Sequence, residues 1–255
     1  MASPAASSGV PATSTGPVDR TQRLDVWRDL IRDHFVALDI DAERHEDFRG
    51  TVRSTRVGHL DIATVESTSQ VCRRSRALAH RDDAVYLQVG LLTQGAAVLS
   101  QDGRAAQLSP GDYAIYETDR PFVWDLHGSW QLQVFTWARA AIPLSEAGSR
   151  GLTARTLDGT TGLGRLVGRM LRDLAGAPPE LTAAGGIRLA DEIGELVTTV
   201  AAEAGAPGSA GRPGAMMGRI EAYIADHLSD PALDAEQVAR AHFLSTRSLH
   251  RLFAR

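Results

Sequence analysis

Four residues near the end of the chain have side chains and a spacing suited to contact nucleic acid: Thr246, Arg247, His250 and Arg251. On a helix that follows an N-cap at Ser245 and runs over Thr246–Arg255, positions three or four apart share a face. The apolar positions of the opposite face are Leu249, Leu252 and Phe253. Arginine can bond two acceptors on a guanine edge, and threonine and the helix N-terminus can bond phosphate. The pattern therefore fits a DNA major groove, with a packing helix that carries a solvated basic face as the alternative.

The residues before this helix predict the elements that would position it. Apolar side chains at helical spacing indicate a first amphipathic helix over Ile220–Ser229, and Asp230-Pro231 ends it. Asp234 is a good N-cap for a second helix, Ala235–His242, and Gln237 stands where a capping box needs it. The sequence thus predicts helix, turn and helix.

The order of these residues resembles the first helix-turn-helix of the AraC/XylS family of transcription regulators. The match is carried by Ile220, Tyr223, Ile224, Leu228, Ser229, Asp230, Pro231, Leu233, Glu236, Val238, Ala239, Leu244, Ser245, Arg247, Leu249, His250, Arg251, Leu252 and Phe253. In that family the second helix of the motif contacts the bases. The resemblance therefore implies base contacts from Arg247, His250 and Arg251, and promoter or operator DNA as the partner.

The match departs from the family pattern at two places. The turn before the last helix has Phe243 where the family often has glycine. The family continues into a second helix-turn-helix, whereas this sequence stops at Arg255. We therefore expect an incomplete DNA-binding unit and weak, largely non-specific DNA binding by these 255 residues.

Composition limits the classes of function that the chain can serve. The net charge is −4, and the segment 216–255 balances five arginines with five acidic residues, so DNA affinity must come from one face. Cys72 is the only cysteine, which excludes an internal disulfide and suits a reducing cytoplasm. No apolar run is long enough to cross a membrane, and the N-terminal residues have neither the charged start nor the apolar core of a signal peptide. We expect a cytoplasmic protein without a membrane partner.

The first part of the chain changes its hydrophobic period from helical to two. Residues 1–17 lack large side chains and predict a disordered tail, and apolar spacing predicts a helix over Thr21–Leu38. Eight short strands follow: Val57–Val65, Ser69–Arg73, Ala84–Leu92, Ala96–Gln101, Arg104–Leu108, Tyr113–Tyr116, Phe122–Leu126 and Trp130–Trp137. Asp102-Gly103 and Ser109–Asp112 are turn signals. Strands this short and this close predict a sandwich or small barrel.

Two runs in this region, V-C-R-R-S and L-S-P-G-D-Y-A-I-Y-E-T-D-R-P-F, resemble the cupin-like ligand-sensing domain of AraC-family regulators. The matching residues are Val71, Arg73, Pro110, Gly111, Asp112, Tyr113, Arg120, Pro121 and Phe122. The resemblance implies a barrel over residues 18–145 whose interior binds an unknown small-molecule effector. Our candidate ligand-binding residues are Tyr86, Gln88, Trp124, His127 and Trp137.

A metal-dependent enzyme on a cupin barrel is the alternative reading. Metal cupins use a His-x-His pair, which this sequence lacks, and His-x-Asp pairs hold iron in other proteins. His-x-Asp occurs three times here, at His45/Asp47, His59/Asp61 and His80/Asp82, so it singles out no site. We therefore predict no metal, no cofactor and no catalytic residue.

The remaining segments predict how the two halves are joined. Apolar stripes predict helices over Gly162–Leu174 and Ile187–Ala202, within a helical region 146–204. They either pack on the barrel or, as the family resemblance implies, pair two copies of the chain. Residues 205–215 read as a flexible linker, and 216–255 as the truncated helix-turn-helix domain.

The expected fold class is α+β: an N-terminal cupin-like β-barrel or sandwich with a helical hairpin, then an incomplete all-α helix-turn-helix unit. The expected function is that of a dimeric, sequence-specific DNA-binding transcription regulator under effector control, and not of an enzyme. A ligand-binding and dimerising protein without specific DNA binding is the second reading, and a metal-dependent cupin enzyme is the third.

Overall fold

The structure is a computed structural model. It describes residues 12–42, 48–82, 84–205, 220, 223–225, 227–228, 230, 233–241 and 246–253, with the backbone alone at 247, 248, 251 and 252. The chain divides into two compact units, Met1–Ala202 and Glu203–Arg255. Each unit is considered by itself.

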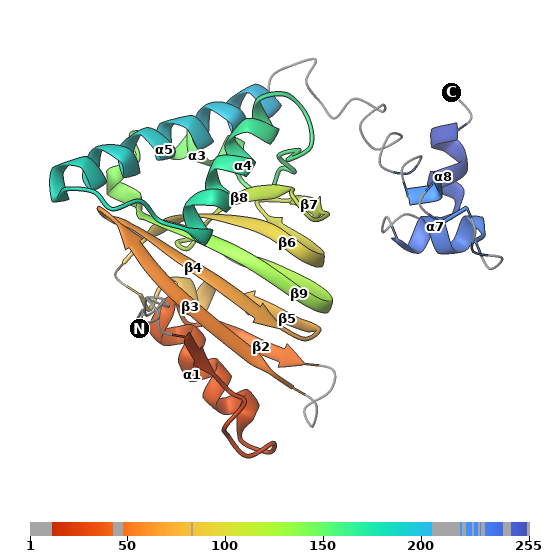
Figure 1. Cartoon of the computed structure of the whole chain (residues 1–255), viewed down its shortest axis with the longest axis horizontal. Coiled ribbons are helices and arrows are strands. Elements are labelled where there is room, and N and C mark those ends of the chain that lie inside the picture. Colours follow the sequence, from red (N-terminus) through yellow and green to blue (C-terminus); the bar gives the residue numbers. More distant parts are fainter. Residues whose placement is uncertain are drawn as a thin grey trace, which may run out of the picture. The chain divides into compact units, whose positions relative to one another are not determined.

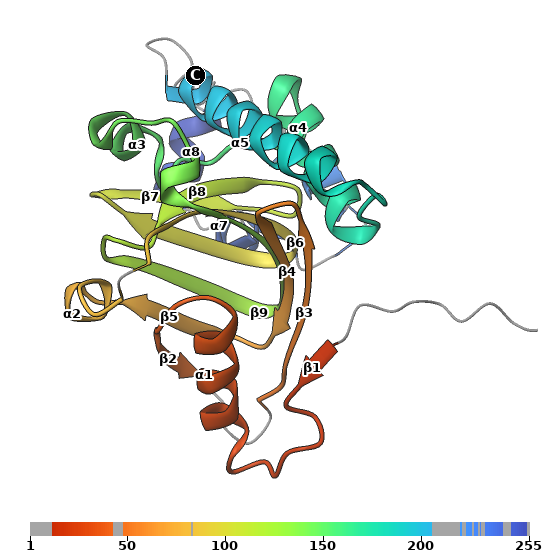
Figure 2. The ribbon, with the colours of Figure 1, turned by 90° about the vertical axis from the view of Figure 1, so that its left-hand side faces the viewer.

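The first unit is built on one antiparallel nine-stranded sheet that curls into a half-barrel (Figures 1 and 2). Its strands are β1 Ala12–Ser14, β2 Asp39–Ala42, β3 Gly50–Val57, β4 Leu60–Ser67, β5 Gln70–Arg74, β6 Tyr86–Gln101, β7 Arg104–Leu108, β8 Tyr113–Glu117 and β9 Phe122–Ala138. Six strands follow the order β1-β3-β4-β9-β5-β2, while β6 pairs with β7, β8 and β9. The mixed α+β class expected from the sequence is confirmed, with a half-barrel as its sheet.

Two long strands, β6 and β9, replace four of the short strands that the sequence predicted. They pair from Tyr86↔Ala138 to Gln101↔Phe122, with register shifts on either side of Gln94. Gly95 and Gly128, which the sequence suggests as chain breaks, adopt φ of 84° and 67°. A residue with positive φ within a β-bulge bends the strand, while strand pairing continues before and after the bulge. The period-two pattern therefore predicted strands correctly but misplaced their ends.

Three further segments differ from the prediction. The predicted strand Val57–Val65 is a hairpin, because β3 ends at Val57 and β4 begins at Leu60. Strand β2 was not predicted. Ala12–Ser14, within the predicted disordered tail, is strand β1 and pairs with β3, since backbone pairing requires no large side chain.

Both predicted turns are confirmed. Asp102 and Gly103 have φ of 51° and 74°, as a two-residue turn between paired strands requires, and they join β6 to β7. In the second turn the backbone N–H of Asp112 donates to the carbonyl of Ser109 at 2.9 Å. The Asp112 carboxylate accepts from the N–H of Ser109 at 3.1 Å and from that of Gly159 at 3.2 Å. Asp112, one of the residues behind the cupin-like resemblance, thus organises the backbone.

Helix α1, Arg23–His34, covers the inner face of the curled sheet (Figure 2). It is shorter than the predicted Thr21–Leu38. Trp27 is fully buried, and its indole N–H donates to Oε1 of Gln70 on β5 at 3.0 Å. Its ring lies directly over Gly50, where a Cβ would come within 2.3 Å of the ring. Trp27 is therefore the side chain that anchors α1 to the sheet.

The helices after β9 cover the other face of the sheet. They are η1 Arg139–Ala141, α3 Glu146–Leu152, α4 Gly162–Gly176 and α5 Ala183–Gly205, while the short helix α2, Arg76–Ala79, follows β5. The Trp137 indole N–H donates to the carbonyl of Ala190 on α5 at 2.9 Å. The Tyr113 hydroxyl donates to the carbonyl of Gly164 on α4 at 3.2 Å. Side chains of β9 alternate between the two faces of the sheet, so that Trp130 and Trp137 are both buried but on opposite faces.

The second unit contains helices α7, Ala235–Ala241, and α8, Thr246–Phe253. Its core consists of Ile220, Val238, Ala239 and Leu249. Asp234 is the N-cap of α7, because its Oδ1 accepts from the N–H of Gln237 at 2.7 Å. The reciprocal half of the capping box is absent among the described residues, since Gln237 Oε1 has no hydrogen-bond partner there. The proposed linker beyond Gly205, Phe243, the N-cap Ser245 and parts of the predicted helix 220–229 lie outside the described residues.

Replacing Trp27 with alanine should remove the anchor of α1. We expect the free energy of unfolding to fall by ~4 kcal/mol, because a large buried aromatic side chain and its hydrogen bond are lost together. Urea denaturation followed by circular dichroism measures the change. The matched control is Val26→Ala on the same helix, whose side chain is 38% exposed. Equal losses for the two variants would contradict this role of Trp27.

Candidate functional site

A small cavity lies between helix α1 and the inner face of the half-barrel, with a volume of about 50 Å³. Its walls come from α1, from the segment after it and from strands β4, β5, β6, β8 and β9. They are formed by Ile31, Phe35, Val36, Leu38, Val65, Gln70, Cys72, Gln88, Tyr116, Phe122, Trp124, Leu126, Trp130, Leu132 and Val134. Within the described part of the chain, no carboxylate, arginine or histidine lines this cavity. Its chemistry is therefore that of an apolar, aromatic site.

The polar groups of the cavity wall are few, and most of them are paired. Gln70 accepts from Trp27, and Gln88 Nε2 donates to Oγ1 of Thr136 at 2.9 Å. The N–H of Trp130 donates to the carbonyl of Thr68 at 2.8 Å. The indole nitrogen of Trp124 is the exception, since it is buried and has no hydrogen-bond partner among the described residues.

Trp124 is held in place by its neighbours. Its ring meets that of Tyr116 edge-on at a centroid distance of 5.5 Å, and it covers Gly90, where a Cβ would clash with the ring at 2.7 Å. Burial raises the pKa of Tyr116, and the nearby Trp124 N–H opposes that rise. The two groups nevertheless do not meet hydrogen-bond geometry. The donor on Trp124 is thus left for another acceptor.

Cys72 lies in the cavity wall as a buried thiol. Burial raises its pKa to about 12, although the charge of Arg73 opposes the rise. The thiolate is therefore scarce near neutral pH, and a thiol in this state is a poor nucleophile. Cys72 is therefore a free, buried side chain of the cavity wall.

The structure brings together two of the five residues predicted to bind an effector. Gln88 and Trp124 line the cavity. Tyr86 lines a separate groove on the protein surface, and the side chain of His127 is 42% exposed beside Asp125. Trp137 lies on the other face of the sheet against α5. Sequence reasoning missed Phe35, Gln70 and Tyr116, because the segment after α1 and strands β5 and β8 meet at the cavity only through the curl of the sheet.

The His-x-Asp patterns, which single out no site in the sequence, do not form His–Asp pairs where the structure describes them. His59 lies 3.4 Å from Asp191, while Asp61 pairs with Arg56 at 2.5 Å. His80 contacts the carbonyl of Arg76 at 2.7 Å. The pair His45/Asp47 lies outside the described residues. Among those described, no group of three or more metal-ligating side chains occurs.

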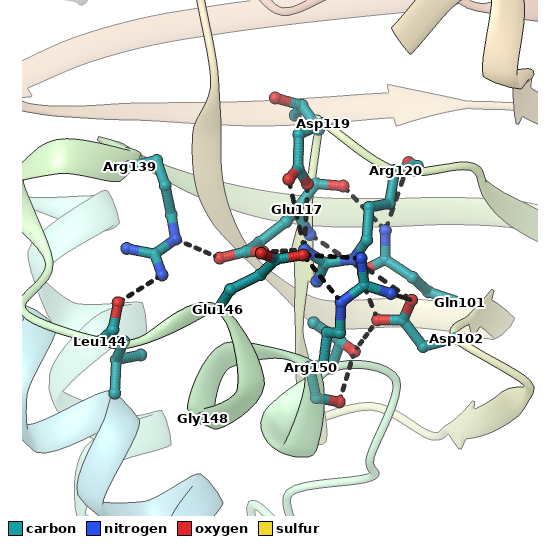
Figure 3. Close-up of polar contacts among 12 residues, drawn as sticks. Gln101, Asp102, Glu117, Asp119, Arg120, Arg139, Leu144, Glu146, Gly148 and Arg150 are labelled. Carbon is teal, nitrogen blue, oxygen red and sulfur yellow. Dashed lines mark hydrogen bonds and ion pairs between the residues drawn. The ribbon is translucent and has the colours of Figure 1, made fainter.

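A second group of reactive side chains is the acid–arginine cluster, which comprises Asp102, Glu117, Asp119, Arg120, Arg139 and Arg150 (Figure 3). Glu117 stands between two arginines: Arg120 Nη1 is 2.5 Å from its Oε2, and Arg139 Nε is 2.5 Å from its Oε1. Arg120 also donates to Asp102 at 3.2 Å and to Asp119 at 3.2 Å. Burial raises the pKa of Asp119, against the charge of Arg120.

The acid–arginine cluster joins elements and offers no free acid. Each of its three carboxylates contacts an arginine, and Asp102 also accepts from the hydroxyl of Thr153 at 2.7 Å. These contacts tie β8 and the start of β9 to η1 and to the segment after α3. Arg120, another residue behind the cupin-like resemblance, therefore has a structural position at the edge of the half-barrel.

Helix α8 carries the residues predicted to contact DNA. Thr246 and His250 are exposed, whereas Leu249 is buried in the core of the second unit. The side chains of Arg247, Arg251 and Leu252 lie outside the described residues. Phe253, predicted on the buried face, is 50% exposed because it stands at the end of the described helix. The two faces predicted for this helix are visible at Thr246, Leu249 and His250.

A curled antiparallel half-barrel closed by one helix, with further helices on its other face, is the fold of cupin-like sensor domains. The chain belongs to the AraC-binding-like domain family, whose sequence model matches residues 27–200. This places it among AraC-family transcription regulators with a sensor domain.

Relatives extend the similarity beyond the sensor domain. The transcriptional activator NphR of Rhodococcus sp. is 26% identical over 248 residues, which span 92% of this chain and 73% of that protein. A protein from the nit 5′ region of Bacillus sp. (strain OxB-1) is 29% identical over 236 residues, 89% of this chain and 90% of its own. The crystal structure of the AraC-like transcriptional activator CuxR has the same fold, with a TM-score of 0.67 at 18% identity over 96% of this chain and 88% of its own. In the described part of the chain, no helix has the length and apolar character needed to span a membrane.

Replacing Glu117 with alanine should destabilise the first unit. We expect a loss of ~3–5 kcal/mol, because Arg139 loses the carboxylate it pairs with and the buried Arg120 keeps only its longer contacts with the other two carboxylates of the cluster. Thermal and urea unfolding measure this loss. The control is Glu146→Ala, since Glu146 is 75% exposed and its pair with Arg150 is solvated. A Glu117 variant as stable as the control would contradict the structural role of the cluster.

Proposed function

We propose that this protein is a dimeric, sequence-specific DNA-binding transcription regulator of AraC/XylS type under the control of a small-molecule effector. The observation that carries the proposal is helix α8, which buries Leu249 and exposes Thr246 and His250, in a chain that belongs to a regulator family. The names of NphR and CuxR as transcription activators favour a regulator over an enzyme.

The DNA-contacting role falls to α8. Arg247, His250 and Arg251 would contact base edges in the major groove, and Thr246 with the helix N-terminus would hold phosphate. The core of Ile220, Val238, Ala239 and Leu249 supports the proposal, because it joins α8 to α7 and so holds the recognition helix on a rigid support. The net charge of −4 confines the DNA-binding surface to this face.

The effector-binding role falls to the cavity under α1. It lies within the family-matched segment, is lined by Gln88 and Trp124, and contains an unused hydrogen-bond donor. Tyr86, His127 and Trp137 do not line the cavity and would contribute only if the ligand contacted surfaces beyond it. Effector binding in the cavity would change the relative placement of the two recognition helices in a dimer. The effector site and the DNA-binding site would then be energetically coupled.

The dimer role falls to the outward faces of α4 and α5. Both helices bury one face on the sheet, as Val167, Leu171, Ile193 and Val197 do. They also leave large apolar side chains exposed: Leu163, Leu166, Ile187 and Leu196. The sequence left two roles open for these helices: packing on the barrel, or pairing two copies of the chain. Both roles are possible together, because they use opposite faces of the same helices.

Replacing Arg251 with alanine should relax base preference. Binding by these 255 residues is expected to be weak and largely non-specific, so selection is done at low salt. Duplexes enriched there from a random pool by the wild-type chain should show a base preference that the variant lacks, at a cost of ~1–3 kcal/mol on the preferred site. The matched control is Arg240→Ala on α7, because Arg240 is exposed and pairs with Glu236 at 2.9 Å. Unchanged selectivity in Arg251→Ala, or the same loss in the control, would contradict the assignment of α8.

Replacing Leu166 with glutamate should weaken self-association. Leu166 is 68% exposed on α4, so the variant keeps its fold but places a charge in the proposed dimer interface. Sedimentation equilibrium should show a wild-type dimer and a variant that dissociates at least ~10-fold more readily. Leu228→Glu, at a residue 72% exposed in the second unit, is the control. A monomeric wild type would refute the dimer.

A further inference from the structure

We infer that the cavity under α1 takes an uncharged, predominantly apolar ligand of aromatic shape, which offers a hydrogen-bond acceptor to the indole N–H of Trp124. The inference rests on the proposed effector-binding role of the cavity and adds the chemical class of the ligand. It draws on three features of the cavity wall: its lack of charge, the buried indole N–H of Trp124 that has no partner among the described residues, and its aromatic lining.

The lack of charge excludes ionised ligands. Among the described residues, the wall contains apolar and aromatic side chains, two glutamines and one thiol. Placing a carboxylate, phosphate or ammonium group there would bury a charge without a partner, which is strongly unfavourable. Arg74, the buried arginine two residues after Cys72 on β5, already has partners. It forms an ion pair with Asp82 at 2.8 Å and donates a hydrogen bond to the carbonyl of Thr118 at 2.6 Å. The wall therefore selects neutral molecules.

The unused donor requires an acceptor on the ligand. A buried N–H without a partner is unfavourable, and indole nitrogen can only donate. The N–H groups of Trp27 and Trp130 already have acceptors, so Trp124 is the one indole of the cavity region left to bind a carbonyl, ether, hydroxyl or nitrile on the ligand. Gly90 and Tyr116 keep its ring in this position.

The size of the cavity indicates which residue must move. At about 50 Å³ it is a fraction of the ~150 Å³ cavity that holds benzene in another protein. Phe35 follows the last residue of α1, lines the cavity and is only half-buried. An outward movement of its ring would admit a flat ligand between Trp124, Trp130 and Phe122, whose ring faces and edges favour another aromatic group. Phe35 is thus the proposed gate.

The test compares three probes of similar shape: benzamide, benzoate and toluene. Binding to the full chain is measured by calorimetry and by tryptophan fluorescence. We expect benzamide to bind at least ~10-fold more tightly than benzoate, since the charged probe lacks a partner in the wall. We also expect benzamide to bind more tightly than toluene, which has no acceptor.

Two tryptophan variants isolate the donor. Trp124→Phe should reduce the preference for benzamide over toluene by ~5–10-fold, which corresponds to one buried hydrogen bond. Trp130→Phe is the matched control, because its N–H is already bound to Thr68, and it should keep that preference. A third variant, Phe35→Ala, should strengthen the binding of benzamide by opening the gate.

Tight binding of benzoate, or the same preference in Trp124→Phe as in the wild type, would refute the inference, and so would the absence of benzamide binding by Phe35→Ala. Circular dichroism confirms that each variant is folded. Selection of DNA duplexes by the wild type is measured separately. A chain that selects DNA but binds none of the probes would keep the proposed regulator and lose only this ligand class.

Discussion

The pairing of β6 with β9 is the constraint on which the rest of the first unit depends. These two strands run beside each other from Tyr86 to Gln101 and from Phe122 to Ala138, and each also pairs with other strands. Bulges near Gln94 bend the pair, so one sheet presents an inner and an outer face. Trp124 and Trp137 belong to the same strand, yet the first serves the cavity and the second supports α5.

The first unit separates its charges from its cavity. The cavity wall under α1 holds neutral side chains, whereas Glu117, Arg120 and Asp102 lie in the acid–arginine cluster where strands, η1 and α3 meet. Buried charges are tolerated there because each has a partner at short distance. An uncharged interior beside a firmly tied rim suits a sensor that must discriminate neutral ligands while keeping its helical layer in place.

The two faces of α4 and α5 serve different purposes. The buried residues, such as Leu171 and Val197, hold the helices on the sheet, and the exposed ones, such as Leu166 and Ile187, form the proposed dimer surface. Trp137 and Tyr113 fasten these helices through hydrogen bonds to backbone carbonyls. A change in the curl of the sheet would therefore move the helices, which gives a physical route from the cavity toward the proposed dimer interface.

Local chemistry was readable from the sequence. The turns at Asp102-Gly103 and Ser109–Asp112 and the N-cap Asp234 depend on neighbouring residues. In α8 the pattern correctly placed Leu249 on the buried face and Thr246 and His250 on the exposed face, but not Phe253. Strand lengths, strand partners and the lining of the cavity depend on contacts between residues far apart in the chain, so only the tertiary structure decided them. Strand pairing across bulges merged four predicted strands into two, and pairing with β3 ordered Ala12–Ser14. Only the curl of the sheet brought Phe35, Gln70 and Tyr116 to Trp124. Only the packed structure left the indole N–H of Trp124 without an acceptor among the described residues.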